Sequence, residues 1–227
     1  MSNSELAQSL EQRLAQLRQN LPDSVRLIAV TKQVPIETMR IAYALGLRDF
    51  AESRIQEAAA KQAELSDWTD VNWHLIGHLQ TNKAAKALEL FQWIHSLDSR
   101  KLAERLDQLA ANLPQKPNLC LQVKILPDPN KYGWSISELL NDLPHLDQYS
   151  HLNIVGLMAI PPYGLDPDQT LSVFTQTQQL AEKIRQQSWQ RIQMQELSIG
   201  MSGDYPLAIE AGATMVRLGR ILFGERA

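Results

Sequence analysis

Residues 26–35 read RLIAVTKQVP. The stretch begins with a short apolar run that includes β-branched residues, and Pro35 interrupts the extended chain soon afterwards. A run of this kind, bounded by a breaker, is typical of a strand buried on both faces of a parallel sheet. Lys32 lies where this strand ends, and two interpretations of it are open. It is either a solvated strand end whose side chain reaches water, or an amine at the mouth of a pocket.

Similar runs recur along the whole chain. Together with the first, they cover residues 25–31, 47–51, 71–77, 92–97, 118–126, 152–160, 195–201 and 213–218. Helix-like segments lie between them, and residues with capping side chains mark where those helices should begin. The predicted helix starts are Ser53, Thr81 or Asn82, Asp98, Asp166 and Asp204.

This strict alternation of strands and helices implies parallel strands joined by right-handed crossovers. A count of eight strands favours a closed (β/α)₈ barrel over an open doubly wound sheet. No linker, low-complexity tract or change of composition divides the sequence. We therefore expect residues 1–227 to form a single-domain TIM barrel of the α/β class. Residues 127–134 and 161–168 should form long loops on its functional face.

An additional helix is expected at the N-terminus, over residues 1–21. Leucines at positions 6, 10, 14, 17 and 21 form one apolar stripe at helical spacing. The stripe could pack on the barrel or on a partner protein, and we favour the barrel. This segment has no continuous apolar stretch, so we do not expect it to be a signal peptide.

The composition limits the classes of function. A net charge of −3 argues against a dominant electrostatic grip on nucleic acid or on an anionic membrane. No segment approaches the ~20 apolar residues that a membrane-spanning helix needs. The single cysteine, Cys120, lies in an apolar run and cannot form an internal disulfide. These features favour the cytoplasm.

In a barrel of this kind, the C-terminal ends of all strands open onto one mouth, where barrel enzymes place their chemistry. Lys32 should lie there, and an amine partly desolvated by an apolar strand can attack an aldehyde to form a Schiff base. Residues 198–204 (SIGMSGD) leave the seventh predicted strand and enter a helix. Small residues before a helix N-terminus suit an anion, and barrels often bind phosphate after strands seven and eight. Ordinary strand–helix turns are the alternative.

Two further stretches carry polar groups of interest. Arg217 lies within an apolar strand, where it needs a partner such as a carboxylate of the barrel interior or a ligand nitrogen or phosphate. His74 belongs to the stretch HLIGHLQTNK (74–83). We favour a hydrogen-bonded position in the core for it over a role in coordinating a bound group. The sequence has no Walker or GxGxxG motif, no nucleophile elbow and no His/Cys cluster with metal-ligand spacing.

Seven ordered motifs resemble one known family, the pyridoxal phosphate homeostasis proteins, also called the proline synthetase co-transcribed family. They are AVTKQVP (29–35), FAESRIQE (50–57), HLIGHLQTNK (74–83), IHSLDS (94–99), GLMAIPP (156–162), LSIGMSGDYPLAI (197–209) and MVRLGRILFG (215–224). The resemblance runs from about residue 20 to the end. It implies a fold-type III barrel, similar to the N-terminal domain of alanine racemase, that binds pyridoxal 5′-phosphate (PLP).

The resemblance also implies roles for individual residues. Lys32 would hold PLP covalently, as an imine. Ser202, with the backbone amides of Gly219 and Arg220, would bind the phosphate, and Arg217 would face the pyridine nitrogen.

Other residues would line the pocket less directly: His74, Asn82, Ser53 and Met201. The family usually has Gly-Glu-Asn after the second strand, whereas this chain has Ala51-Glu52-Ser53. Any hydrogen bond made by the amide of that asparagine is therefore replaced or lost here. No metal site is expected.

Three functions are compatible with these residues. Racemases use a second base, a tyrosine that a further domain supplies, and this chain has no obvious replacement, although Tyr132 and Tyr163 fall on the mouth loops. The first hypothesis is therefore a PLP carrier that serves PLP homeostasis and amino-acid and keto-acid balance, without robust catalysis. It would act as a monomer, with PLP-dependent apo-enzymes as possible partners. A slow fold-type III racemase or decarboxylase is the second, and a phosphate-binding barrel of another chemistry is the third.

Overall fold

The strands of the protein close into a barrel. The structure is a computed structural model and describes residues 3–224. Eight strands form a ring in which every neighbouring pair is parallel, and β9 pairs with β1 to close it. In ring order they are β1 (Arg26–Val30), β2 (Asp49–Glu52), β3 (Asn72–Leu75), β4 (Trp93–Leu97), β5 (Asn118–Lys124), β7 (Asn153–Ala159), β8 (Glu196–Met201) and β9 (Met215–Leu218). The predicted (β/α)₈ barrel is confirmed. Seven of these strands lie within predicted runs, and β2 extends one residue beyond its run, to Glu52.

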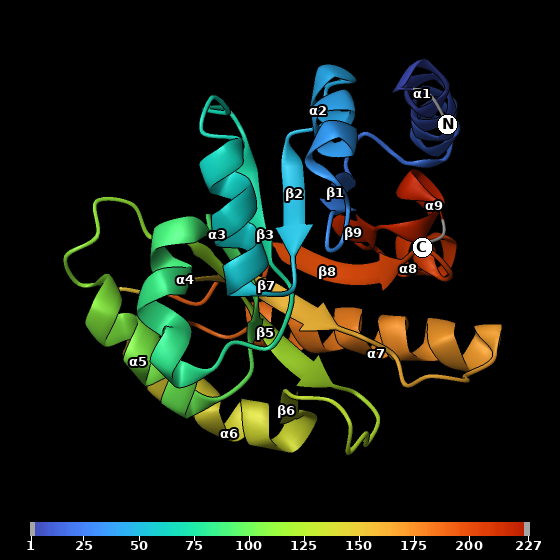
Figure 1. The fold of residues 1–227 in the computed structure, drawn as a ribbon. Coiled ribbons are helices and arrows are strands. Elements are labelled where there is room, and N and C mark those ends of the chain that lie inside the picture. The colour runs from blue at the N-terminus through green and yellow to red at the C-terminus, as the bar shows by residue number, and fades with distance from the viewer. Residues whose placement is uncertain (1–2, 225–227) are drawn as a thin grey trace.

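Helices surround the ring on its outside (Figure 1). They are α1 (Asn3–Asn20), α2 (Ile36–Ala44), α3 (Ile55–Glu64), the 3₁₀ turn η1 (Thr81–Lys83) with α4 (Ala84–Leu90), α5 (Arg100–Ala110), α6 (Ile136–Leu146), α7 (Pro167–Arg185), α8 (Tyr205–Glu210) and α9 (Arg220–Phe223). A two-residue strand, β6 (Trp134–Ser135), pairs with the end of β5 outside the ring.

The N-terminal helix α1 packs on the side of the barrel, against α2 and α9. Its leucine stripe is buried through Leu10, Leu14 and Leu17, as expected for a helix that packs on its own barrel. The helix that follows the last strand, α9, has only four residues. The side of α9 is therefore covered by α1, and the first helix of the chain helps to complete the outer layer.

Some helix boundaries differ from the prediction. The helix expected to begin at Ser53 has Arg54 as its N-cap, and the one expected at Asp98 has Ser99. Asp98 instead accepts a hydrogen bond from Nδ1 of His78, 2.7 Å away. Helix α6 is not among the predicted helices, although Ser135 and Glu138 form a capping box at its start.

The core has two parts because both faces of the strands are buried. Between strands and helices lies a large apolar layer that includes Ala29, Phe50 and Leu75. A smaller apolar cluster includes Ile28, Val30 and Met215, which alternate with the first set along their strands and therefore face the barrel interior. Histidine, serine and arginine side chains share this interior with the apolar cluster.

Gly156 in β7 lies directly against the backbone of β8. A Cβ at this position would lie 1.8 Å from the carbonyl oxygen of Glu196 in β8. We expect Gly156→Ala to lower the free energy of unfolding by at least about 2 kcal/mol, because the two strands must separate to admit the methyl group. Urea unfolding measures this loss. Gly203→Ala is the matched control, since no atom lies within 4 Å of its added Cβ, and equal stability of the two variants would contradict the prediction.

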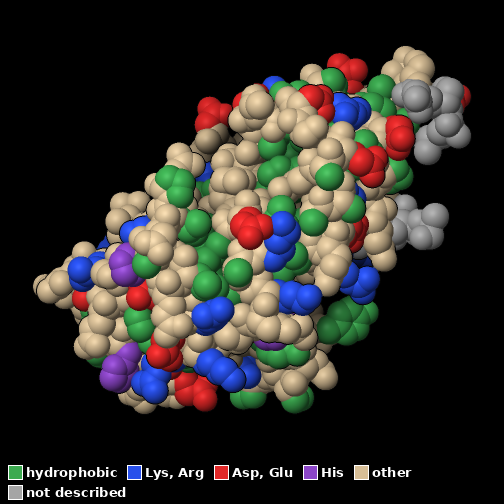
Figure 2. Space-filling model, turned by 60° about the vertical axis from the view of Figure 1, so that its left-hand side comes forward, with side chains coloured by type: hydrophobic (Ala, Val, Ile, Leu, Met, Phe, Trp, Pro, Cys, Tyr) green, Lys and Arg blue, Asp and Glu red, His purple; other side chains and the backbone are tan. Residues whose placement is uncertain are grey.

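The surface carries both kinds of charge. On the face drawn in Figure 2, Lys and Arg side chains are interspersed with Asp and Glu. Such a mixture gives no strong field of one sign on this face. Within residues 3–224, none of the helices combines the length and the apolar character that crossing a bilayer requires.

Candidate functional site

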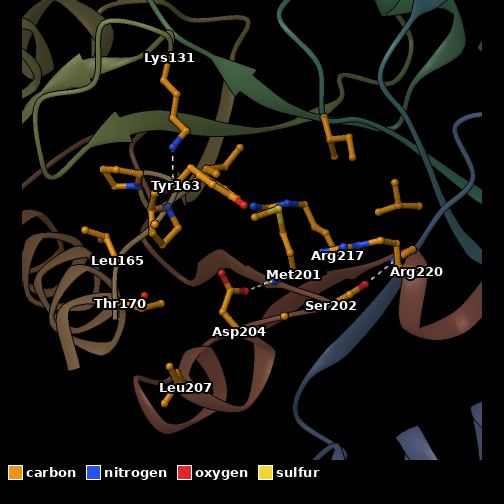
Figure 3. A pocket seen from close by; sticks show the side chains of 18 of the residues that line it. Lys131, Tyr163, Leu165, Thr170, Met201, Ser202, Asp204, Leu207, Arg217 and Arg220 are labelled. Carbon is orange, nitrogen blue, oxygen red and sulfur yellow. Dashed lines mark hydrogen bonds between the residues drawn. The ribbon is translucent and has the colours of Figure 1, made fainter. Parts of the chain in front are cut away.

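A cavity of about 630 Å³ opens at the C-terminal end of the barrel. Its lining comes from the ends of β1, β2, β3, β8 and β9 and from the loops that precede α6 and α7. Figure 3 shows Arg217, Met201 and Ser202 along one side and Lys131 reaching toward the loop of Tyr163 from the other. The cavity therefore lies at the mouth where the sequence places its functional groups.

Most of the predicted site residues meet in this cavity. They are Lys32, Ser53, Met201, Ser202, Arg217, Gly219 and Arg220. Lys32 thus lies in the same cavity as the residues that follow β8 and β9, more than 160 positions away along the chain.

Two predicted residues do not line the cavity, and their predicted contact is corrected here. His74 is fully buried inside the barrel, where its ring nitrogens lie 2.9 Å from Nε2 of His95 and 3.0 Å from Oδ1 of Asp49. Asn82 is exposed in the 3₁₀ turn η1. Strand alternation points His74 into the barrel interior, and its burial and hydrogen bonds confirm the core position that the sequence predicted for it.

Arg217 is held by main-chain oxygens. Nη1 donates to the carbonyl of Ser198 at 2.6 Å and to its hydroxyl at 2.7 Å, and Nη2 donates to the carbonyl of Ala159 at 3.2 Å. The partner expected for it was a carboxylate or a ligand, and neutral oxygens of β7 and β8 fill much of that role. Burial lowers the pKa of Arg217 to about 10, partly opposed by Asp204, so the guanidinium remains charged at neutral pH.

Ser202 lies beside the start of α9. Its hydroxyl accepts hydrogen bonds from the backbone amides of Gly219 at 3.2 Å and Ile221 at 3.3 Å. Ser202, Gly219 and Arg220 all line the cavity, and Figure 3 shows Ser202 and Arg220 on the same side of it. Hydroxyl, amide and cationic donors in one place suit an anion with several oxygens.

A buried ionic cluster supports the turn that carries Lys32. Nζ of Lys61 donates to the carbonyl oxygen of Thr31 at 2.6 Å, to Glu52 at 2.8 Å and to Glu57 at 2.7 Å. Glu57 also accepts from the backbone amide of Gln33 at 2.5 Å, and Gln33 has a φ of 60°. This left-handed conformation is uncommon for a residue with a side chain. The residues on both sides of Lys32 are therefore fixed by one cluster.

The carboxylates of this cluster have opposite pKa shifts. Burial raises the pKa of Glu52, although hydrogen bonds from Lys61 and Thr31 oppose the shift. For Glu57, burial acts in the same direction but is outweighed by hydrogen bonds from Lys61 and Gln33, which hold its pKa below the usual value. The ammonium of Lys61 therefore serves both carboxylates, at 2.8 Å from Glu52 and 2.7 Å from Glu57.

The cavity is also lined by residues that were not predicted to lie in the site. Nζ of Lys131 donates to the carbonyl of Pro161 at 2.5 Å and joins the two mouth loops. Asp204 lines the cavity, its Oδ1 accepts from the amide of Met201 at 2.6 Å, and burial raises its pKa. Thr170 and Leu207 line it from α7 and α8. Lys131 lies in a loop that was already predicted to face the mouth, so its position in that loop could have identified it as a site residue.

The donor set favours an organic anion over a metal. Within the part of the chain that the structure describes, no three His, Cys, Asp or Glu side chains gather in a way that could hold a metal ion. The cavity instead combines two lysine amines, two guanidinium groups and backbone amides with apolar walls from residues such as Val30 and Ile160. These are the requirements of a phosphorylated molecule with an apolar ring.

Comparisons with known proteins agree with this arrangement. The sequence profile of the family described as "Alanine racemase, N-terminal domain" matches residues 7–227. A pyridoxal phosphate homeostasis protein of Synechocystis sp. is 53% identical over 206 residues, which are 91% of this chain and 94% of that protein. Another from Pseudomonas aeruginosa is 41% identical over 206 residues, which are 90% of this chain and 86% of that protein.

Solved structures give the same result. PipY of Synechococcus elongatus PCC7942, with PLP bound, has a TM-score of 0.90 at 52% identity and covers 95% of this chain and 100% of its own. An alanine racemase of Clostridium difficile covers 96% of this chain and 56% of its own with a TM-score of 0.73, and at 14% identity it supports the fold alone. The chain therefore belongs to the alanine racemase N-terminal domain family and, within it, to the pyridoxal phosphate homeostasis proteins.

Proposed function

We propose that this protein binds PLP in the cavity at the barrel mouth and holds its aldehyde as a reversible imine on Nζ of Lys32. The observation that carries the proposal is that Lys32, Arg217 and the donors around Ser202 line one cavity. The PLP-bound structure of a relative 52% identical to this chain supports the same ligand.

The residues of the cavity fit the chemical groups of PLP. Its phosphate would be held by the hydroxyl of Ser202, the backbone amides of Gly219 and Arg220, and the guanidinium of Arg220. A helix N-terminus and a cation together favour a dianion. Met201 and Ser53 would contact the ring from the walls of the cavity. When bound, PLP supplies an aldehyde that forms imines with amines and a ring that can withdraw electrons.

The protein's own residues favour a carrier over a fast enzyme. Arg217 has only hydrogen-bond donors, so a ring nitrogen that faces it must accept a hydrogen bond and stay unprotonated. An unprotonated ring withdraws electrons weakly and does not favour carbanion chemistry. The two tyrosines on the mouth loops, Tyr132 and Tyr163, are 56% and 104% exposed, so water surrounds the groups that would have to act as a second base.

The proposed role is PLP homeostasis inside the cell. The protein would limit the concentration of free aldehyde, release PLP to PLP-dependent apo-enzymes and so affect the balance of amino acids and keto acids. We place it in the cytoplasm as a monomer, because its one thiol, Cys120, is buried and unpaired and the outer layer of the barrel is completed by its own α1. A slow racemase or decarboxylase that uses the same lysine is the second candidate.

Borohydride reduction followed by peptide mapping tests the proposed site. Freshly purified protein is incubated with PLP, reduced and digested, and we expect the phosphopyridoxyl adduct on Lys32 alone. An adduct on another lysine, or no uptake of PLP, would refute the proposal and leave a barrel of another chemistry. Incubation with amino acids in D₂O separates the two candidates, since exchange of the α-hydrogen at turnover rates would favour the enzyme.

A further inference from the structure

Polar side chains form a continuous chain through the interior of the barrel. Starting at the cavity, Nη1 of Arg217 donates to Oγ of Ser198 at 2.7 Å, and that oxygen lies 2.8 Å from Nδ1 of His95. Nε2 of His95 lies 2.9 Å from Nδ1 of His74, whose Nε2 lies 3.0 Å from Oδ1 of Asp49. Asp49 begins β2, so the chain runs from the mouth of the barrel to its opposite end.

The chemistry of its two ends fixes the direction of this chain. A guanidinium can only donate, so Ser198 accepts from Arg217 and directs its own proton to Nδ1 of His95. Nδ1 of His95 is then an acceptor, and Nε2–H donates to Nδ1 of His74. The same logic gives His74 its proton on Nε2, which donates to the carboxylate of Asp49, a group that can only accept.

The environment keeps both rings neutral. His74, His95 and Ser198 are fully buried. Burial lowers the pKa of both histidines, and for His95 the charges of Arg217 and Arg26 act in the same direction. The indole of Trp93 stacks on His74 with ring centroids 5.6 Å apart. Each ring therefore has one donor and one acceptor, both of which the chain uses.

We infer that Ser198, His95 and His74 are positioning residues for Arg217, and that this directed chain holds the guanidinium in place and links it to Asp49. The inference rests on the proposed function only in so far as Arg217 faces the bound cofactor. Removing a link leaves a buried donor or acceptor without a partner, and the guanidinium loses part of its support.

The first test uses the protein without PLP. The whole protein has five histidines. Long-range ¹H–¹⁵N spectra of labelled protein distinguish the protonation states of their rings. We expect two rings to be neutral and protonated on Nε2 at pH 7, assigned by their loss in His74→Gln and His95→Gln. A proton on Nδ1 of either ring, or averaging between the two forms, would overturn the directed chain.

The second test breaks the chain next to the arginine. Ser198→Ala should speed the exchange of the Nη protons of Arg217 in the protein without PLP, weaken PLP binding by about three- to tenfold and shift the absorption maximum of bound PLP. Ser96→Ala is the matched control, because Ser96 is also a buried serine of the barrel but donates to the carbonyl of Gly77 at 2.6 Å, outside the chain.

The outcomes separate this inference from the proposed function. If Ser198→Ala behaves like Ser96→Ala in proton exchange, absorption and affinity, the positioning role is wrong. If the unaltered protein takes up no PLP, the proposed function fails. The protonation states of the histidine rings and the exchange of the Nη protons of Arg217 can still be measured in that protein, and they decide whether the hydrogen-bonded chain holds Arg217.

Discussion

The Lys32→Ala variant is expected to bind PLP about 100-fold more weakly than the unaltered chain and to lack the yellow absorption of the imine. The covalent bond to Nζ is removed, while the donors around Ser202 and Arg217 remain, so weak noncovalent binding should persist. A 100-fold loss corresponds to about 2.8 kcal/mol. Absorption spectra and equilibrium dialysis with PLP measure the two effects.

Two control variants separate the covalent bond from charge and from location. Lys32→Arg keeps the cation but cannot form the imine, and it should resemble Lys32→Ala in its spectrum. Lys124→Ala also removes a lysine from the C-terminal end of a barrel strand, β5, but this residue does not line the cavity. It should keep both the colour and the affinity, and a loss there equal to that of Lys32→Ala would contradict the assignment of Lys32.

The Lys61→Met variant is expected to lose about 3–5 kcal/mol of unfolding free energy, because it leaves buried carboxylates without their cation. Lys61 is 8% exposed, and its ammonium makes three hydrogen bonds, to Thr31, Glu52 and Glu57. Methionine fills a similar volume but offers no donor. Urea unfolding at neutral pH measures the loss.

The matched control for this variant is Lys86→Met. Lys86 also pairs with a glutamate on its own helix, Glu89, but both side chains are more than half exposed. An exposed pair contributes at most about 1 kcal/mol, so the control should be nearly neutral. Adding Glu52→Gln to Lys61→Met should recover part of the stability, because a neutral amide replaces the most deeply buried charge. A Lys61→Met protein as stable as the control would contradict the structural role of the cluster.

The sequence was sufficient to predict the fold, because hydrophobic periodicity and alternation are local properties. All eight barrel strands overlap predicted runs, and only β2 extends beyond its run, by one residue; Asp166 caps α7 as its side chain suggests. When two neighbouring residues can both serve as the N-cap of a helix, the sequence alone does not show which of them does. At residues 98–99, the serine caps α5 because the aspartate is bonded to His78 from another loop.

The site was predictable where a residue's position on its strand determines its surroundings. Lys32, Ser202 and Arg217 lie at or near strand ends, and the barrel topology alone brings them together. The contacts of Lys61 were not predictable in this way. Its spacing to Glu57 is that of an ordinary surface pair on a helix, and only the packing of α3 against β2 buries it against Glu52. The hydrogen-bonded series through His95 likewise depends on side chains from five strands.

The polar interior of the barrel bears on how this scaffold could be redesigned. Branched aliphatic side chains usually fill the lumen of a TIM barrel, whereas here two histidines, a serine and an arginine occupy much of it. Exchanging mutually bonded polar groups for apolar ones of the same shape can be nearly neutral for stability. The lumen is therefore the place where an engineer could exchange whole sets of mutually bonded side chains for a different chemistry while the apolar layer beneath the helices stays unchanged.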